Sequence, residues 1–101
     1  MGSQSDSARK QTNIILYRMH EVPIEDWIDL HTFQPREVGI VVEEYLYQAV
    51  QHGFTAVRII HGRGIGVQRE IVRSILGKHP NVKAFQDAPD RGSTYVTLKI
   101  L

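Results

Sequence analysis

The sequence contains no cysteine, which excludes disulfide bonds, a thiol nucleophile and thiolate metal ligands. It has no apolar run near the roughly 20 residues that span a bilayer, and its first residues lack the apolar core of a signal peptide. These absences predict a cytoplasmic protein that does not enter a membrane. The net charge is only +1, so affinity for a polyanion would require positive charge concentrated on one face.

The length and composition suit one small domain. The chain has 101 residues, of which 42% are hydrophobic, and this is enough for a single core. Residues 1–11 are small and polar and are predicted to form a disordered tail. Residues 12–26 are predicted to form an arm or an extra strand, and residues 27–101 the folded domain.

Hydrophobic periodicity predicts the order β-α-β-α-β-β. The expected strands cover 27–31, 55–60, 82–86 and 94–101. The first helix begins at Pro35, with Gln34 as a weak N-cap and Glu37 near the exposed amides, and ends at Gly53. The second helix covers 67–76 and ends at Gly77. The fold class is therefore α/β, an α+β sandwich with a mixed four-stranded sheet and both helices on one face.

Repeated spacings of three and four predict which side chains are buried. In the last strand, alternation places Tyr95 and Lys99 on the outer face. Trp27 and the tyrosines other than Tyr95 are expected in the core. The expected inward positions are Val38, Val41, Val42, Tyr45, Leu46, Ala49 and Val50 in the first helix, Val67, Ile71, Val72, Ile75 and Leu76 in the second, and Val96, Leu98 and Ile100 in the last strand.

The most informative motif is HGRGIG at 61–66, between a strand and a helix. Its glycines permit positive φ and close backbone approach, and a helix N-terminus favours an anion. On spacing alone, a phosphate site and a tight turn with solvated arginines are equally good interpretations. The loop fits neither GxGxxG nor a Walker motif. The candidate phosphate-binding residues are Gly62, Arg63, Gly64, Gly66, Arg69 and Arg73.

A second motif lies at the end of the first strand, where Asp29 and His31 would point to the same face. A carboxylate beside an imidazole can act as an acid–base pair, or the two can share a metal ion. The alternative is a strand-end aspartate with an exposed histidine, which the spacing alone favours. In a parallel pair of strands, His31 and His61 would both follow carboxyl ends, where open α/β sheets bind ligands.

Together these residues resemble the Smr (small MutS-related) domain. The resemblance rests on Asp29-Leu30-His31, the VRIIHGRG segment at 57–64, Arg69 and the HPNV segment at 79–82, and it runs from Trp27 to Leu101. It implies a fold similar to the C-terminal domain of translation initiation factor three. Two positions depart from the family: Thr32 stands where glycine is frequent, and the turn at 88–93 holds only Gly92.

Many Smr domains are endonucleases that nick DNA or cut RNA without strong sequence preference. The resemblance implies that Asp29 and His31 are the catalytic pair, and that residues 61–66 with Arg69 hold the phosphate. In a nuclease, His31 would act as general base, and His61 would protonate the leaving oxygen.

Three functions remain open at this point. The first is an endonuclease that is structure-selective rather than sequence-selective, with DNA or RNA backbone as its partner. The alternative is a non-catalytic module that recognises backbone or junction shape. A third is a binder of a small phosphorylated metabolite. No cofactor is certain and no metal-ligand set is assigned, although a divalent metal such as magnesium is left open.

Overall fold

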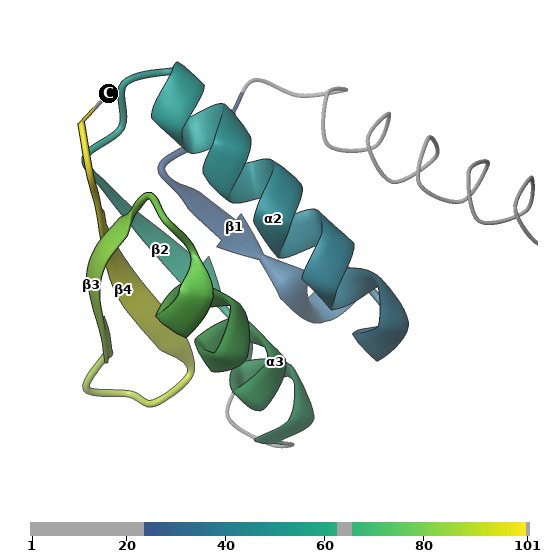
Figure 1. Cartoon of the computed structure of the whole chain (residues 1–101). Helices are drawn as coiled ribbons and strands as arrows, with labels where there is room; N and C mark the ends of the chain where they lie inside the picture. Colours follow the sequence, from purple (N-terminus) through teal and green to yellow (C-terminus); the bar gives the residue numbers. More distant parts are fainter. Residues whose placement is uncertain (1–23, 63–65, 101) are drawn as a thin grey trace, which may run out of the picture.

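A computed structural model describes residues 24–62 and 66–100. It contains a four-stranded sheet with two α-helices on one face (Figure 1), which confirms the predicted fold class. The predicted tail and most of the predicted arm lie outside the described residues. The elements are β1 (Trp27–Asp29), a 3-10 turn η1 (Leu30–Thr32), α2 (Pro35–Gln51), β2 (Ala56–Ile60), α3 (Gly66–Lys78), β3 (Val82–Asp87) and β4 (Ser93–Leu98).

The strands are ordered β1-β2-β4-β3 across the sheet. β1 and β2 are parallel, whereas β4 runs antiparallel to both β2 and β3. β3 is therefore parallel to β2, with β4 inserted between them. As a result, β1, β2 and β3 all end at the edge of the sheet where β4 begins.

Local sequence signals define both ends of α2. The backbone amide of Gln34 donates to Oε1 of Glu37 at 2.8 Å, as in a capping box. At the other end Gly53 has a φ of 78°, and its amide donates to the carbonyl of Val50 at 3.0 Å. The predicted role of Gly53 as the helix stop is confirmed. Within the described residues, no helix combines the length and apolarity needed to cross a membrane.

The core lies between the helices and the facing side of the sheet. Every predicted inward residue of α2 is buried, in agreement with the 3.6-residue period. The other elements that contribute each add one or two side chains. These are Leu30 from η1, Val57 and Ile59 from β2, Val72 and Leu76 from α3, and Val96 and Leu98 from β4.

Several sequence predictions at the ends of elements are wrong. Trp27 is 48% exposed because it lies on the sheet face that no described helix covers. Val67 is exposed in the first turn of α3, and Ile100 is exposed because β4 ends at Leu98. Gly77 does not stop α3, which continues to Lys78.

Candidate functional site

The candidate site lies at the sheet edge where β1 and β2 end. Asp29 is paired with Ile60 in the parallel register, so the chain leaves both strands at the same level. His31 follows the first strand, and His61 and Gly62 follow the second. The sheet therefore brings the two predicted motifs to one edge, which is where open α/β sheets bind ligands.

Asp29 and His31 form a close pair. The sequence predicts a strand as far as His31, but β1 ends at Asp29 and the chain turns into η1. Oδ1 of Asp29 accepts a hydrogen bond from the backbone amide of His31 at 3.0 Å and lies 2.8 Å from Nδ1 of the same residue. The two side chains lie close together, as the sequence predicts, but the predicted reason is wrong. They meet because Asp29 caps the turn η1, and not because residues 29 and 31 alternate along a strand.

This contact defines the chemistry of the pair. Burial raises the pKa of Asp29, but hydrogen bonds from the backbone amide and ring of His31 outweigh it and hold that pKa below its ordinary value. The carboxylate is thus ionised at neutral pH, and it orients the ring by accepting from Nδ1. The His31 side chain is 74% exposed, which leaves Nε2 to accept a proton from a ligand.

His61 has a different environment from the one the sequence predicts. It is only 5% exposed, with Nδ1 3.0 Å from the carbonyl oxygen of Gly62 and Nε2 2.9 Å from Oγ1 of Thr94. A carbonyl can only accept, so Nδ1 donates, and in the neutral ring Nε2 accepts from the Thr94 hydroxyl. Thr94 is fully buried on the helix side of the sheet. The expectation that His61 shares one cleft with Asp29 and His31 is therefore wrong.

The β3–β4 turn holds the start of the glycine loop. The carbonyl of Gly92 accepts hydrogen bonds from the backbone amides of His61, at 3.0 Å, and Gly62, at 2.9 Å. The turn is itself fixed by Asp90, whose Oδ1 accepts from the Gly92 amide at 2.9 Å. Arg91 takes the positive φ of 61°. One glycine is therefore enough here, because an arginine adopts the left-handed conformation.

Arg69 and Arg73 do not form a separate cationic patch opposite the apolar stripe of α3. Both are half-buried beside β3 and bind the carboxylate of Asp87, Arg69 in a close ion pair and Arg73 at 3.2 Å. Hydrogen bonding to Arg69 holds the pKa of Asp87 below its usual value. Arg69 also lies 3.3 Å from a carboxylate oxygen of Glu70, so the two guanidinium groups and the two carboxylates carry no net charge together.

Gly62 has the positive φ that the motif predicts, at 86°, whereas Gly66 is the first residue of α3. Arg63 and Gly64 lie outside the described residues. The N-terminus of α3 is nevertheless at the same edge as Gly62, and its free amides favour an anion there.

We expect Gly62→Ala to destabilise the fold by about 1–2 kcal/mol, because a β-carbon disfavours a left-handed φ. An added methyl group would meet no atom within 4 Å, so the effect is purely conformational. Gly66→Ala is the matched control: it also has free space, lies in a helix, and should be neutral or slightly stabilising. Urea denaturation of both variants measures the difference. Equal stability of the two would contradict the conformational role of Gly62.

Two residues of the site, Asp87 and Thr94, carry no signal in the local sequence. Asp87 is the partner of Arg69 and Thr94 is the partner of His61. Asp87 and Thr94 are also paired with each other across β3 and β4, so their contacts with the site depend on β4 lying next to β2. No local sequence motif predicts that strand order. A signal did exist for Trp27, since alternation around Ile28 places Trp27 on the same face as the polar Asp29.

No metal-ligand set emerges from the described parts of the chain. Across residues 24–62 and 66–100, no group of three or more His, Asp or Glu side chains is arranged to hold a metal ion. The Asp29–His31 pair supplies two such side chains, one fewer than a group of that size requires.

Comparisons with known proteins agree with these features. The family model described as the Smr domain matches residues 28–99. An Endonuclease MutS2 of Caldicellulosiruptor bescii is 37% identical over 83 residues, which are 78% of this chain and 10% of the relative. An Endonuclease MutS2 of Halalkalibacterium halodurans is 37% identical over 71% of this chain and 10% of its own. The chain thus spans about a tenth of the length of these relatives.

Two solved structures share the fold. The crystal structure of the Smr domain of Thermus thermophilus MutS2 superposes with a TM-score of 0.69 at 31% identity, covering 72% of this chain and 96% of that one. The structure of YdaL, a stand-alone small MutS-related protein from Escherichia coli, gives a TM-score of 0.64 at 28% identity over 81% of this chain and 70% of its own.

Proposed function

The chain belongs to the Smr domain family, and from this we propose that it binds the sugar-phosphate backbone of nucleic acid and cleaves it as a structure-selective endonuclease. The observation that carries the proposal is the Asp29–His31 pair at the edge that also holds Gly62 and the start of α3. An exposed imidazole with an oriented Nε2 lies at the same edge as amides that favour an anion.

The proposed reaction is the cleavage of one phosphorus–oxygen bond. A backbone phosphate binds at the loop and the α3 N-terminus, where Arg69, in the first turn of α3, can donate a hydrogen bond to it. Nε2 of His31 takes a proton from water, or from a ribose 2′-hydroxyl, as that oxygen attacks phosphorus. The negative carboxylate of Asp29 stabilises the imidazolium that forms. The leaving oxygen takes its proton from solvent, because both nitrogens of His61 are bound inside the protein.

A non-catalytic binding module is the second candidate. The observation that favours it is the burial of His61, which leaves His31 as the exposed imidazole of this edge within the described part of the chain. A binding domain needs the anion site and no second proton-transfer group. In that case Asp29 would serve only to cap η1.

A cleavage assay separates the two candidates. Purified protein is incubated with labelled single-stranded, duplex and branched DNA and RNA, with and without magnesium. An endonuclease produces discrete cuts near junctions or single-stranded segments across many sequences. Retarded bands without cleavage under every condition would leave the binding module as the function.

We expect affinity for duplex DNA to fall with salt at a small slope, about −0.9 per phosphate contact, because the net charge is only +1. Replacing Arg69 by alanine should weaken binding to all sequences about equally. It should also reduce the magnitude of the salt slope by about 0.9, the value for one lost phosphate contact. Lys78→Ala, at the opposite end of α3, is the control and should change neither. Affinity that is independent of salt, or restricted to one sequence, would contradict a backbone-binding role.

A further inference from the structure

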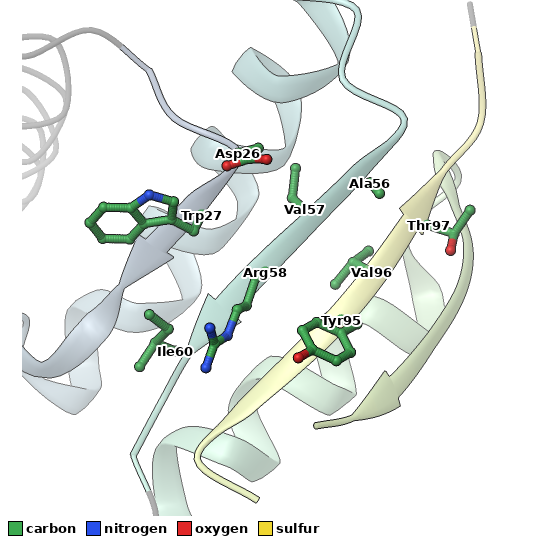
Figure 2. A pocket seen from close by; sticks show the side chains of 9 residues that line it. All are labelled: Asp26, Trp27, Ala56, Val57, Arg58, Ile60, Tyr95, Val96 and Thr97. Atoms are coloured by element: carbon green, nitrogen blue, oxygen red, sulfur yellow. The ribbon is translucent and has the colours of Figure 1, made fainter. Parts of the chain in front are cut away.

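Among residues 24–62 and 66–100, no helix lies on one of the two faces of the sheet. Both helices pack on the other face (Figure 1), and the open face holds a hollow of about 570 Å³. The residues that line it come from β1, β2 and β4 and from the approach to β1, as Figure 2 shows. They are Asp26, Trp27, Ala56, Val57, Arg58, Ile60, Tyr95, Val96 and Thr97.

Three flat side chains form a row across this face. Trp27 pairs with Arg58 in the β1–β2 register, and Arg58 pairs with Tyr95 in the β2–β4 register. Since neighbouring strands lie about 4.8 Å apart, the backbone positions of Trp27 and Tyr95 are about 10 Å apart. In Figure 2 the side chains of Arg58 and Tyr95 lie next to each other over β2 and β4, and the ring of Trp27 lies further away over β1.

The two aromatic rings are available to a ligand. Trp27 is 48% exposed and Tyr95 is 41% exposed, and neither belongs to the core that the helices and sheet form. Large aromatic side chains gain most when they are covered. Packing of the core therefore does not explain why two large aromatic side chains are exposed on either side of Arg58 in the same row.

Arg58 is held in place between the rings. Its Nε donates to Oγ of Ser93 at 2.9 Å, and Nη2 lies 3.5 Å from a carboxylate oxygen of Asp90. The guanidinium also lies over the ring of Tyr95, 5.8 Å from the ring centre. It thus presents a fixed, flat cationic surface that can attract a phosphate or stack on a base.

One end of the row lies beside the candidate active site. Asp29 lies two residues beyond Trp27 on the same strand, hence on the same face and about 7 Å further along. A nucleotide stacked on Trp27 would therefore lie about 7 Å from Asp29, so the adjoining backbone could reach the Asp29–His31 pair.

Resting on the nucleic-acid function proposed above, we propose that Trp27, Arg58 and Tyr95 form a stacking platform for unpaired nucleotides next to the cleavage site. Every base has an aromatic face, so the platform accepts any sequence but only bases that are not paired in a duplex. Asp90 offsets part of the charge of Arg58, so stacking rather than attraction to phosphate provides most of the affinity. The platform gives the structure selectivity: it favours a backbone that is single-stranded beside the scissile phosphate.

The intrinsic fluorescence of the protein tests this directly, because Trp27 is its only tryptophan. The full chain is titrated with a short oligodeoxythymidylate, and separately with an abasic oligonucleotide of equal length and charge. We expect quenching by the first and little by the second. Equal quenching by both would overturn the platform, because the abasic strand has phosphates but no bases.

Tyr95→Ala should weaken binding of the single-stranded oligonucleotide by about 5- to 100-fold, the range of base–aromatic stacking. Tyr47→Ala is the matched control, since Tyr47 is a 56% exposed tyrosine on α2. Thermal unfolding confirms that both variants fold. Equal affinities of the two variants would overturn the proposal.

Duplex binding separates this proposal from the function on which it rests. Salt-dependent duplex binding without base-dependent quenching would overturn the platform alone. Loss of binding to every nucleic acid would overturn both. A dimer in sedimentation analysis that dissociates on Tyr95→Ala would identify a second copy of the chain as the occupant instead.

Discussion

Replacing His31 by alanine is expected to lower the rate of phosphodiester cleavage by about 10²- to 10⁴-fold, the contribution of a general acid–base group. Affinity should change little, because the proposed phosphate site consists of the loop, the α3 N-terminus and Arg69 and does not include His31. The His31 ring is mostly exposed, so its loss should leave the stability of the fold nearly unchanged. Single-turnover cleavage of a branched substrate, together with its affinity, measures both effects.

Two variants make the result specific. Asp29→Asn retains a side-chain oxygen that can cap η1 but removes the negative charge, so it should also slow cleavage. His52→Ala is the control, because His52 is an exposed histidine at the end of α2 and should have no effect. Cleavage by His31→Ala at the parental rate would place any nuclease activity elsewhere.

His61→Ala is expected to reduce the free energy of unfolding by on the order of 2–4 kcal/mol. The substitution leaves a cavity and removes the partner of the buried Thr94 hydroxyl. It also frees the carbonyl of Gly62, which shapes the loop. Urea denaturation measures the loss, and it should be accompanied by weaker phosphate binding rather than by an altered pH–rate profile.

A double-mutant cycle with Thr94→Val tests the cause. Because the two side chains share one hydrogen bond, the double variant should lose less stability than the two single variants combined. A His61→Ala protein as stable as the parent, with altered pH dependence of cleavage, would instead identify His61 as a proton donor to the substrate.

The sequence predicted the fold well because local signals defined its main elements. The apolar stripe of α2 and the stop at Gly53 are visible in the order of residues, and both are confirmed. The errors lie where local pattern and tertiary position disagree. Trp27 reads as a core residue by type, but no helix of the described residues covers its face of the sheet, and it is 48% exposed. Ile100 follows the alternation of β4, but the strand has already ended.

The site was only partly visible in the sequence for the same reason. The closeness of Asp29 and His31 is local, so two residues were enough to suggest it. The environment of His61 is not local, since Thr94 is more than thirty residues away. Arg69 likewise looks like a free cation in the sequence, and only the pairing of β3 with β4 brings Asp87 to it.

The insertion of β4 between β2 and β3 determines the order in which the molecule can assemble. Two of the three ladders of the sheet require β4, and β4 is the last of the four strands to be synthesised. Until it emerges from the ribosome, β3 has no partner and only the short pair of β1 and β2 can form. The amides of the glycine loop also await the Gly92 carbonyl just before β4. Contacts between residues distant in sequence slow folding, so we expect His61 and Gly62, at the start of the glycine loop, to acquire their hydrogen bonds in the final step, together with the centre of the sheet.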